Sequence, residues 1–210
     1  MSDLATTPAT TIRHAQETVR ARLRDGGIAD LRPLEAGEAD ALLAVFDGMS
    51  ASSRALRYLT GLPRLPNQML SVLTAVDGDR HVAWLASVDG APAGIGRFVR
   101  VPGCPTSAEL AFEVVDEQHG RGLATLLLDA VTTVADARGV RRIQGTMAPA
   151  NVASRRLMER VGARGGTVSG LLEVEGRLRL LHPPALDRSA VLQLACAPGS
   201  SAEQGRVRTG

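Results

Sequence analysis

The stretch from residue 109 to residue 125 holds the residue types of this chain that are best suited to chemistry. It has the pattern of a strand, a short polar turn and the glycine-rich start of a helix. Gly120 and Gly122 carry no side chain where the backbone enters the helix, so the N–H groups of residues 120–125 can face an anion, with the helix dipole behind them. Arg121 adds a positive charge. The pattern predicts a pyrophosphate site, and a glycine-rich helix start without any ligand is the alternative.

Two other kinds of phosphate site do not fit this stretch. A P-loop requires a lysine, and all 24 residues in the Lys+Arg count are arginine. A dinucleotide fingerprint places its first glycine directly after a parallel strand. Here residues 116–119 intervene, and the preceding strands have the pattern of hairpins. We therefore expect neither an NTPase nor a dinucleotide-binding fold.

The elements that must position this stretch alternate between strand and helix patterns, with glycine and proline at the boundaries. Asp89-Gly90 and Pro102-Gly103 predict hairpin turns between successive strands. The predicted strands are Ile28–Leu34, His81–Val88, Gly94–Val101, Ser107–Val115 and Val140–Thr146, with two more within Ala163–Leu181. The predicted helices are Glu35–Phe46, Ser50–Leu59, Gln68–Leu73, Gly122–Arg138 and Asn151–Val161. This order predicts an α+β fold, a mostly antiparallel mixed sheet flanked by helices.

The chain is long enough for one domain with tails, because domains typically have about 100–200 residues. We expect the domain to span residues 28–181. Residues 1–27 are rich in Thr and Ala and then charged, which predicts a mobile arm or an extra helix. Residues 182–210, with Pro183-Pro184 near their start, are expected to form a tail.

Composition excludes several classes of function. The net charge is +2 and aromatic residues make up 2% of the chain, so there are no stacking platforms and we expect no nucleic-acid partner. No apolar run approaches the roughly 20 residues of a membrane span, and the polar N-terminus is unlike a secretory signal. The two cysteines are far apart and the four histidines lack metal-ligand spacing, so we expect no metal and a cytoplasmic location.

Two motifs resemble the GNAT superfamily of acyl-CoA-dependent N-acetyltransferases. The pyrophosphate motif of that family, Gln/Arg-x-x-Gly-x-Gly/Ala, is matched at all but its first position by His119-Gly120-Arg121-Gly122-Leu123-Ala124. A second motif, Asn-x-x-Ala-x-x-Leu-Tyr-x-x-x-Gly-Phe, is matched at Asn151, Leu157 and Gly162. The resemblance covers roughly residues 28–181. It implies a GNAT-like fold, acetyl-CoA as co-substrate and an amine as acceptor.

A narrower resemblance links the chain to the catalytic domains of bacterial Pat-type protein-lysine acetyltransferases. It is carried by Ser50-x-x-Ser53-Arg54-x-Leu56-Arg57-Tyr58, by residues 77–86, by Gly94-Ile-Gly-Arg97 and by Ala108-Glu-Leu-Ala-Phe112. It implies that the acceptor is a protein lysine. A small-molecule amine is the alternative, because the additional domains of those enzymes do not occur in these 210 residues.

The resemblance also implies roles for single residues. Glu109 matches the general base of the protein-acetylating members of the family, and Glu113 is our second choice, because it shares a strand face with Glu109. Backbone N–H groups near Val114 and Val115 are expected to polarise the thioester carbonyl. His119 to Thr125 are expected to form the phosphate turn.

Two positions on the predicted helix at 151–161 leave alternatives open. Asn151 caps this helix, contacts the cofactor, or does both. Met158 occupies the position of the tyrosine that usually protonates the leaving thiolate, and methionine cannot donate a proton. Water or Ser154 could take over that task. A non-catalytic acyl-CoA sensor is therefore the alternative to an N-acetyltransferase.

Overall fold

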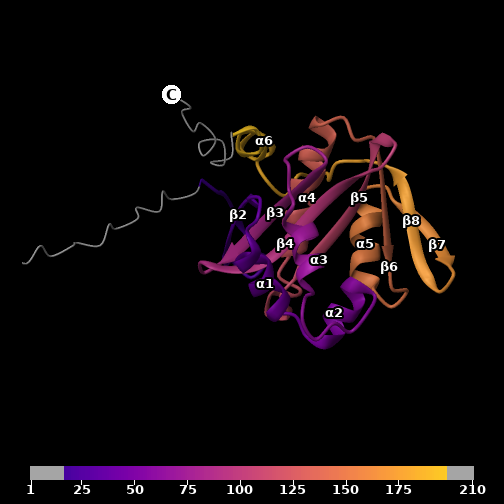
Figure 1. Cartoon of the computed structure of the whole chain (residues 1–210). Coiled ribbons are helices and arrows are strands. Elements are labelled where there is room, and N and C mark those ends of the chain that lie inside the picture. The colour runs from indigo at the N-terminus through magenta and orange to yellow at the C-terminus, as the bar shows by residue number, and fades with distance from the viewer. Residues whose placement is uncertain (1–16, 198–210) are drawn as a thin grey trace, which may run out of the picture.

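An eight-stranded sheet forms the centre of the computed structural model, which describes residues 17–197 (Figure 1). Its strand order is β1-β2-β3-β4-β5-β6-β8-β7. Neighbouring strands are antiparallel except β5 and β6, which are parallel. The strands are β1 (Val19–Arg22), β2 (Ile28–Pro33), β3 (His81–Val88), β4 (Ala91–Val101), β5 (Cys104–Val114), β6 (Arg142–Met147), β7 (Arg164–Val168) and β8 (Leu171–Arg177). The expected α+β class with a mostly antiparallel sheet is confirmed.

Helices cover both faces of this sheet. They are α1 (Ala39–Asp47), α2 (Ala51–Tyr58), α3 (Asn67–Thr74), α4 (Leu123–Ala137), α5 (Val152–Arg160) and α6 (Arg188–Cys196), with a short 3-10 helix η1 (Asp116–Gln118) before α4. α4 packs against β3, β4 and β5, and α1 packs against β4 and β5. A side chain at Gly96 of β4 would come within 3.1 Å of Leu127, so this glycine lets α4 lie close to the sheet. Figure 1 shows α5 beside β6 and the β7–β8 hairpin at the right-hand edge.

The predicted hairpin turn at Asp89-Gly90 has the geometry that its sequence favours. Asp89 has a φ of 51° and Gly90 a φ of 78°. Positive φ at both central residues is the mark of the type I′ turn, whose twist matches that of paired strands. This turn joins β3 to β4, and β4 in turn pairs with β5.

Both ends of the described chain differ from the expectation of an arm and a tail. The N-terminal segment contains β1, which pairs with β2, where an arm or an extra helix was expected. Residues 1–16 and 198–210 of the expected arm and tail lie outside the described residues. The segment after residue 181 contains α6, which packs on α4. Asp129 of α4 is fully buried and accepts hydrogen bonds from the N–H groups of Ala185 and Leu186, at 2.6 and 2.9 Å. These contacts hold the chain after β8 against α4. The described helices are all too short or too polar to traverse a lipid bilayer.

Candidate functional site

The parallel strands β5 and β6 separate part of the way along their length. They pair only where Ser107–Glu109 lie beside Arg142–Gln144. Beyond that point β5 continues to Val114 and β6 to Met147 without pairing to each other. A cleft of about 450 Å³ lies at this end of the sheet, lined by residues of α2, the end of β5, the start of α4 and α5. The loop at residues 119–122, called the glycine-rich loop below, also lines it. The site is therefore built where the sheet opens.

Backbone groups at the end of β5 point into this opening. In an antiparallel pair, residues alternate between bonded and non-bonded positions. The Val115 N–H donates to the Ala93 carbonyl of the neighbouring segment at 3.0 Å, so Val114, one residue earlier, is at a non-bonded position facing Gly94. The Val114 N–H therefore points toward β6. Of the two expected backbone donors, Val114 lines the cleft, whereas the Val115 N–H is already used within the sheet.

The glycine-rich loop presents a row of N–H groups at the same cleft. Within residues 17–197, the N–H groups of residues 120–124 donate to no backbone or side-chain acceptor, as expected for the first turn of a helix. The Thr125 N–H is an exception, because it donates to the Gly122 carbonyl at 2.9 Å. The expected anion cradle therefore comprises residues 120–124. Thr125 borders it through a hydroxyl that accepts from Arg160 at 2.9 Å.

The two charged residues of the phosphate motif have different positions. His119 lines the cleft, and its Nε2 lies 3.1 Å from the Val114 carbonyl oxygen. Arg121 does not line the cleft. Its guanidinium pairs with Asp25 at 2.5 Å and also donates to Gln118. The expected positive charge of Arg121 is thus turned away from the cradle.

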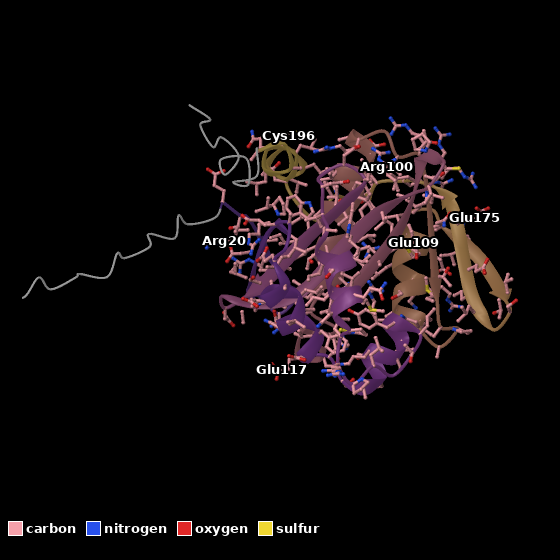
Figure 2. All side chains as sticks on the ribbon, viewed as in Figure 1. Arg20, Arg100, Glu109, Glu117, Glu175 and Cys196 are labelled. Atoms are coloured by element: carbon pink, nitrogen blue, oxygen red, sulfur yellow. The ribbon has the colours of Figure 1, made fainter. Side chains whose placement is uncertain are left out.

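Glu109 lies on β5 at the last residue that pairs with β6. It lies opposite Gln144 of β6 on one side and opposite Val99 of β4 on the other. Its side chain is exposed and is outside the lining of the cleft. Figure 2 shows Glu109 near the middle of the sheet and Glu117, in η1 before the glycine-rich loop, at the lower edge of the molecule. The base candidate and the residues expected to form the anion cradle are therefore at separate places.

Glu113 shares a strand face with Glu109 but has a different environment. It is buried, and its carboxylate accepts hydrogen bonds from Arg97 at 2.7 Å and from the Tyr58 hydroxyl at 2.5 Å. Arg57 lies 3.6 Å away. Burial opposes ionisation, but the charges of Arg57 and Arg97 together with these hydrogen bonds lower the pKa of Glu113 below its ordinary value. A carboxylate held in this way is a weak proton acceptor.

Tyr58, which donates to this carboxylate, is itself a poor acid. Burial and the nearby negative charge of Glu113 raise the pKa of Tyr58 far above its ordinary value. The segment that resembles Pat-type enzymes includes Arg57 and Tyr58, but the sequence indicates no role for either residue. Arg57 lines the cleft, and its Nε is buried without a hydrogen-bond partner in the described structure.

Asn151 is the N-cap residue of α5, and Met158 lies in the last turn of this helix. Asn151 lines the cleft and caps the helix, because its side chain accepts from the Ser154 N–H at 3.0 Å. Its amide also donates to the Leu56 carbonyl of α2 at 3.4 Å, which ties α2 to α5. Met158 is buried outside the lining of the cleft, and its methyl group lies 3.2 Å from the position that a Cβ at Gly145 would occupy. Ser154 lines the cleft.

Metal ligands are not brought together in the described residues. Between residues 17 and 197, no three His, Cys, Asp or Glu side chains are close enough to hold a metal ion. The groups that line the cleft are backbone donors, the buried carboxylate of Glu113, the His119 ring, hydroxyl groups and arginines, whereas the exposed carboxylate of Glu109 lies outside this lining.

Comparison with known families gives one match that covers most of the chain. A family model described as an acetyltransferase (GNAT) domain matches residues 30–164. Acetyltransferase Pat of Mycolicibacterium smegmatis is 32% identical over 146 residues, which are 68% of this chain. The match spans only 43% of that relative's own length.

Solved structures show the same fold. The GNAT domain of PAT from S. lividans has a TM-score of 0.70 and 29% identity, with 79% of this chain and 99% of that domain covered. The structure of yncA from Salmonella typhimurium with its cofactor acetyl-CoA has a TM-score of 0.56 and 17% identity, with 74% and 97% covered. The second likeness concerns the fold alone.

Proposed function

The chain belongs to the GNAT acetyltransferase family, and we propose that it transfers an acetyl group from acetyl-CoA to a primary amine by direct attack. The observation that carries this proposal is the opening between β5 and β6 with the unpaired N–H groups of residues 120–124 at its end. An opening in the sheet can admit an extended thioester arm, and a row of N–H groups at a helix start binds phosphate oxygens. Acetyl-CoA is a co-substrate that contains both an extended thioester arm and a pyrophosphate.

Several features of the cleft fit this co-substrate. The N–H groups of residues 120–124 suit its pyrophosphate. Val114 offers a backbone N–H that points into the opening and can donate to the thioester carbonyl. Gly122 has a φ of 95°, and a larger side chain there would project against Arg24 at the rim of the cleft. Asn151 lines the cleft, and we assign it a contact there in addition to its cap.

When bound, acetyl-CoA supplies a thioester whose carbonyl carbon accepts the amine nitrogen, so that a C–N bond forms as the C–S bond breaks. Glu109 takes the proton that the amine must lose, directly or through one water molecule. This proton acceptor is needed because a lysine of pKa ~10.4 is neutral in only about one molecule in 2,500 at pH 7. Ser154 or water returns a proton to the departing thiolate, since Met158 has none to give.

We propose a protein lysine as the acceptor, ahead of a small amine. The support is the resemblance to Pat-type enzymes together with the exposure of Glu109, which leaves the proton acceptor open to a large partner. None of the 210 residues is a lysine, so no lysine of this chain can be the acceptor. Both cysteines are exposed and free of disulfides, which fits a reducing compartment such as the cytoplasm.

The proposal is tested by release of free CoA thiol from acetyl-CoA, measured with a panel of small amines and with lysine-containing proteins. We expect thiol release that depends on the acceptor, and acetylated lysine in the protein arm. Turnover of a small amine without transfer to any protein would reverse the order of acceptors. Binding of acetyl-CoA without thiol release in either arm would favour the sensor function, for which Met158 is the supporting observation.

A further inference from the structure

The turn between β1 and β2 lies directly on the glycine-rich loop. The turn is closed by a hydrogen bond from the Leu23 N–H to the Gly27 carbonyl at 2.8 Å. The Arg24 N–H then donates to the Arg121 carbonyl at 3.0 Å. Residues almost 100 positions apart in the sequence therefore form one surface at the rim of the cleft.

Arg121 serves to hold this turn in place. Its Nε donates to the Asp25 carboxylate at 2.5 Å, and this hydrogen bond lowers the pKa of Asp25. Its guanidinium also packs over Gly27, where a side chain would come within 2.6 Å of Arg121 Nη2. Together with its contact to Gln118, these interactions leave Arg121 committed to protein partners.

Arg24 is the arginine that faces the cradle. Its side chain lines the cleft and extends across Gly122, with its Cγ 3.3 Å and its Nε 3.5 Å from the position that a Cβ of Gly122 would occupy. It is exposed, and its guanidinium has no ion-pair or hydrogen-bond partner in the described part of the chain. A free guanidinium beside unpaired backbone N–H groups is complementary in charge and hydrogen-bonding geometry to a phosphoryl group.

We propose that Arg24 binds a phosphoryl group of acyl-CoA, and that the Asp25–Arg121 pair positions the turn that carries it. This inference rests on the proposed use of acetyl-CoA. The roles differ from those that the sequence suggests. Arg121, inside the phosphate motif, is structural, and Arg24, on the β1–β2 turn, binds the phosphoryl group. The phosphoryl group could belong to the pyrophosphate or to the 3′-phosphate of the co-substrate.

The test compares Arg24→Gln with the wild type in binding of acetyl-CoA and of 3′-dephospho-acetyl-CoA by calorimetry. Arg22→Gln is the matched control, because Arg22 is also an exposed arginine on this hairpin but lies outside the cleft. We expect Arg24→Gln to weaken binding of acetyl-CoA by about tenfold or more, the range for a hydrogen bond to a charged group. The same change with Arg22→Gln is expected to be less than about twofold, and Arg24→Lys should recover part of the affinity.

The two ligands separate the sources of the phosphoryl group. An equal loss with both ligands assigns Arg24 to the pyrophosphate, and a loss confined to acetyl-CoA assigns it to the 3′-phosphate. The Tm of each variant without ligand is measured first, because a direct contact predicts unchanged stability. If the wild type binds acetyl-CoA and Arg24→Gln binds it equally well, the inference about Arg24 is wrong. If the wild type itself does not bind, the proposed function fails.

Discussion

Two glutamates on one face of β5 illustrate how environment decides chemistry at the scale of the residue. Glu109 is exposed at the point where the sheet opens, and Glu113 is buried between Arg57, Arg97 and Tyr58. A proton acceptor needs access to the amine and a free lone pair. The oxygens of Glu113 already accept hydrogen bonds, so we assign the base to Glu109 and a positioning role to Glu113.

Replacement of Glu109 by Gln is expected to lower kcat/KM by about 10²–10⁴-fold at pH 6.5, because the shape is kept and the proton acceptor is lost. The loss should shrink toward pH 9.5, since more of the amine is then neutral without help. Affinity for acetyl-CoA should remain nearly unchanged. The measurement is kcat/KM of both proteins across this range with one acceptor.

Glu175→Gln is the control for that experiment, because Glu175 is an exposed glutamate on β8, one strand beyond Gln144 (Figure 2). It should behave as the wild type at every pH. A Glu109→Gln enzyme within about threefold of the wild type at pH 6.5 would exclude Glu109 as an important base. A loss that is equal at all pH values would indicate positioning rather than proton transfer.

Glu113→Gln is expected to reduce stability at pH 7 by about 3–5 kcal/mol, because it breaks a buried ion pair and leaves Arg97 uncompensated. The pKa of Glu113 is lowered from its ordinary value of 4.5, so the stability it contributes is present above pH 4.5 and is lost as the pH falls through the folded-state value. Urea unfolding of both proteins between pH 3 and 7 should show curves that converge toward acid. Parallel curves over this range would contradict an ionised Glu113.

At the scale of the element, the start of α4 combines a left-handed glycine with the proposed anion site. Gly122 precedes the helix with a φ of 95°, in the left-handed region that favours glycine. Gly139 follows the C-terminal end of the same helix, and its φ is 81°. Any other residue would therefore be similarly strained at either position. Of the two glycines, only Gly122 borders the cleft.

Gly122→Val is expected to lose the thermal stabilisation by acetyl-CoA, because the valine side chain would lie against Arg24 in the space of the pyrophosphate. At 100 times the Kd, the wild type should gain about 2.7 kcal/mol, which is a Tm increase of roughly 5–10 °C. Gly139→Val is the matched control. Both variants should be less stable without ligand by about 1–3 kcal/mol.

Only Gly139→Val should keep the full shift with acetyl-CoA. Gly122→Ala serves as a second variant if Gly122→Val does not fold. A normal shift in a folded Gly122 variant would mean that the pyrophosphate binds elsewhere.

At the scale of the whole molecule, the C-terminal segment completes the core around α4. Asp129 is fully buried on this helix and accepts from two backbone N–H groups and from Arg188 at 2.9 Å. Arg188 also donates to the Leu181 carbonyl at 2.6 Å. One carboxylate thus joins the central helix to the last described helix, and the charge is compensated by partners that all lie after β8.

Asp129→Asn is expected to destabilise the protein by about 3–5 kcal/mol, because it removes the charge that these donors require. Asp136→Asn, also on α4, is the control. Asp136 pairs with Arg141 at 2.9 Å, but both side chains are about half exposed, so its loss should cost about 0–1 kcal/mol. Urea unfolding gives the free energy of unfolding of both variants. Equal effects of the two substitutions would show that Asp129 does not anchor the segment.

The sequence alone was sufficient for most elements and for the family resemblance, because these depend on short-range patterns. The turn at Asp89-Gly90 follows from two residues that accept positive φ. The helix after Gly122 follows from apolar spacing and from a glycine-rich start. β1 was missed because its alternation of Val and Ala with two exposed arginines extends over only four residues, too few to indicate a strand without its pairing to β2.

The arrangement of the site required the tertiary structure, because it depends on contacts between distant segments. Strand pairing decides that β5 and β6 part after Glu109 and that the Val114 N–H faces the opening. An ion pair between residues 25 and 121 decides which arginine faces the cradle. Residue identity and spacing encode how each segment folds locally, whereas hydrogen bonds and ion pairs between segments determine which of its charged groups remain free for a ligand.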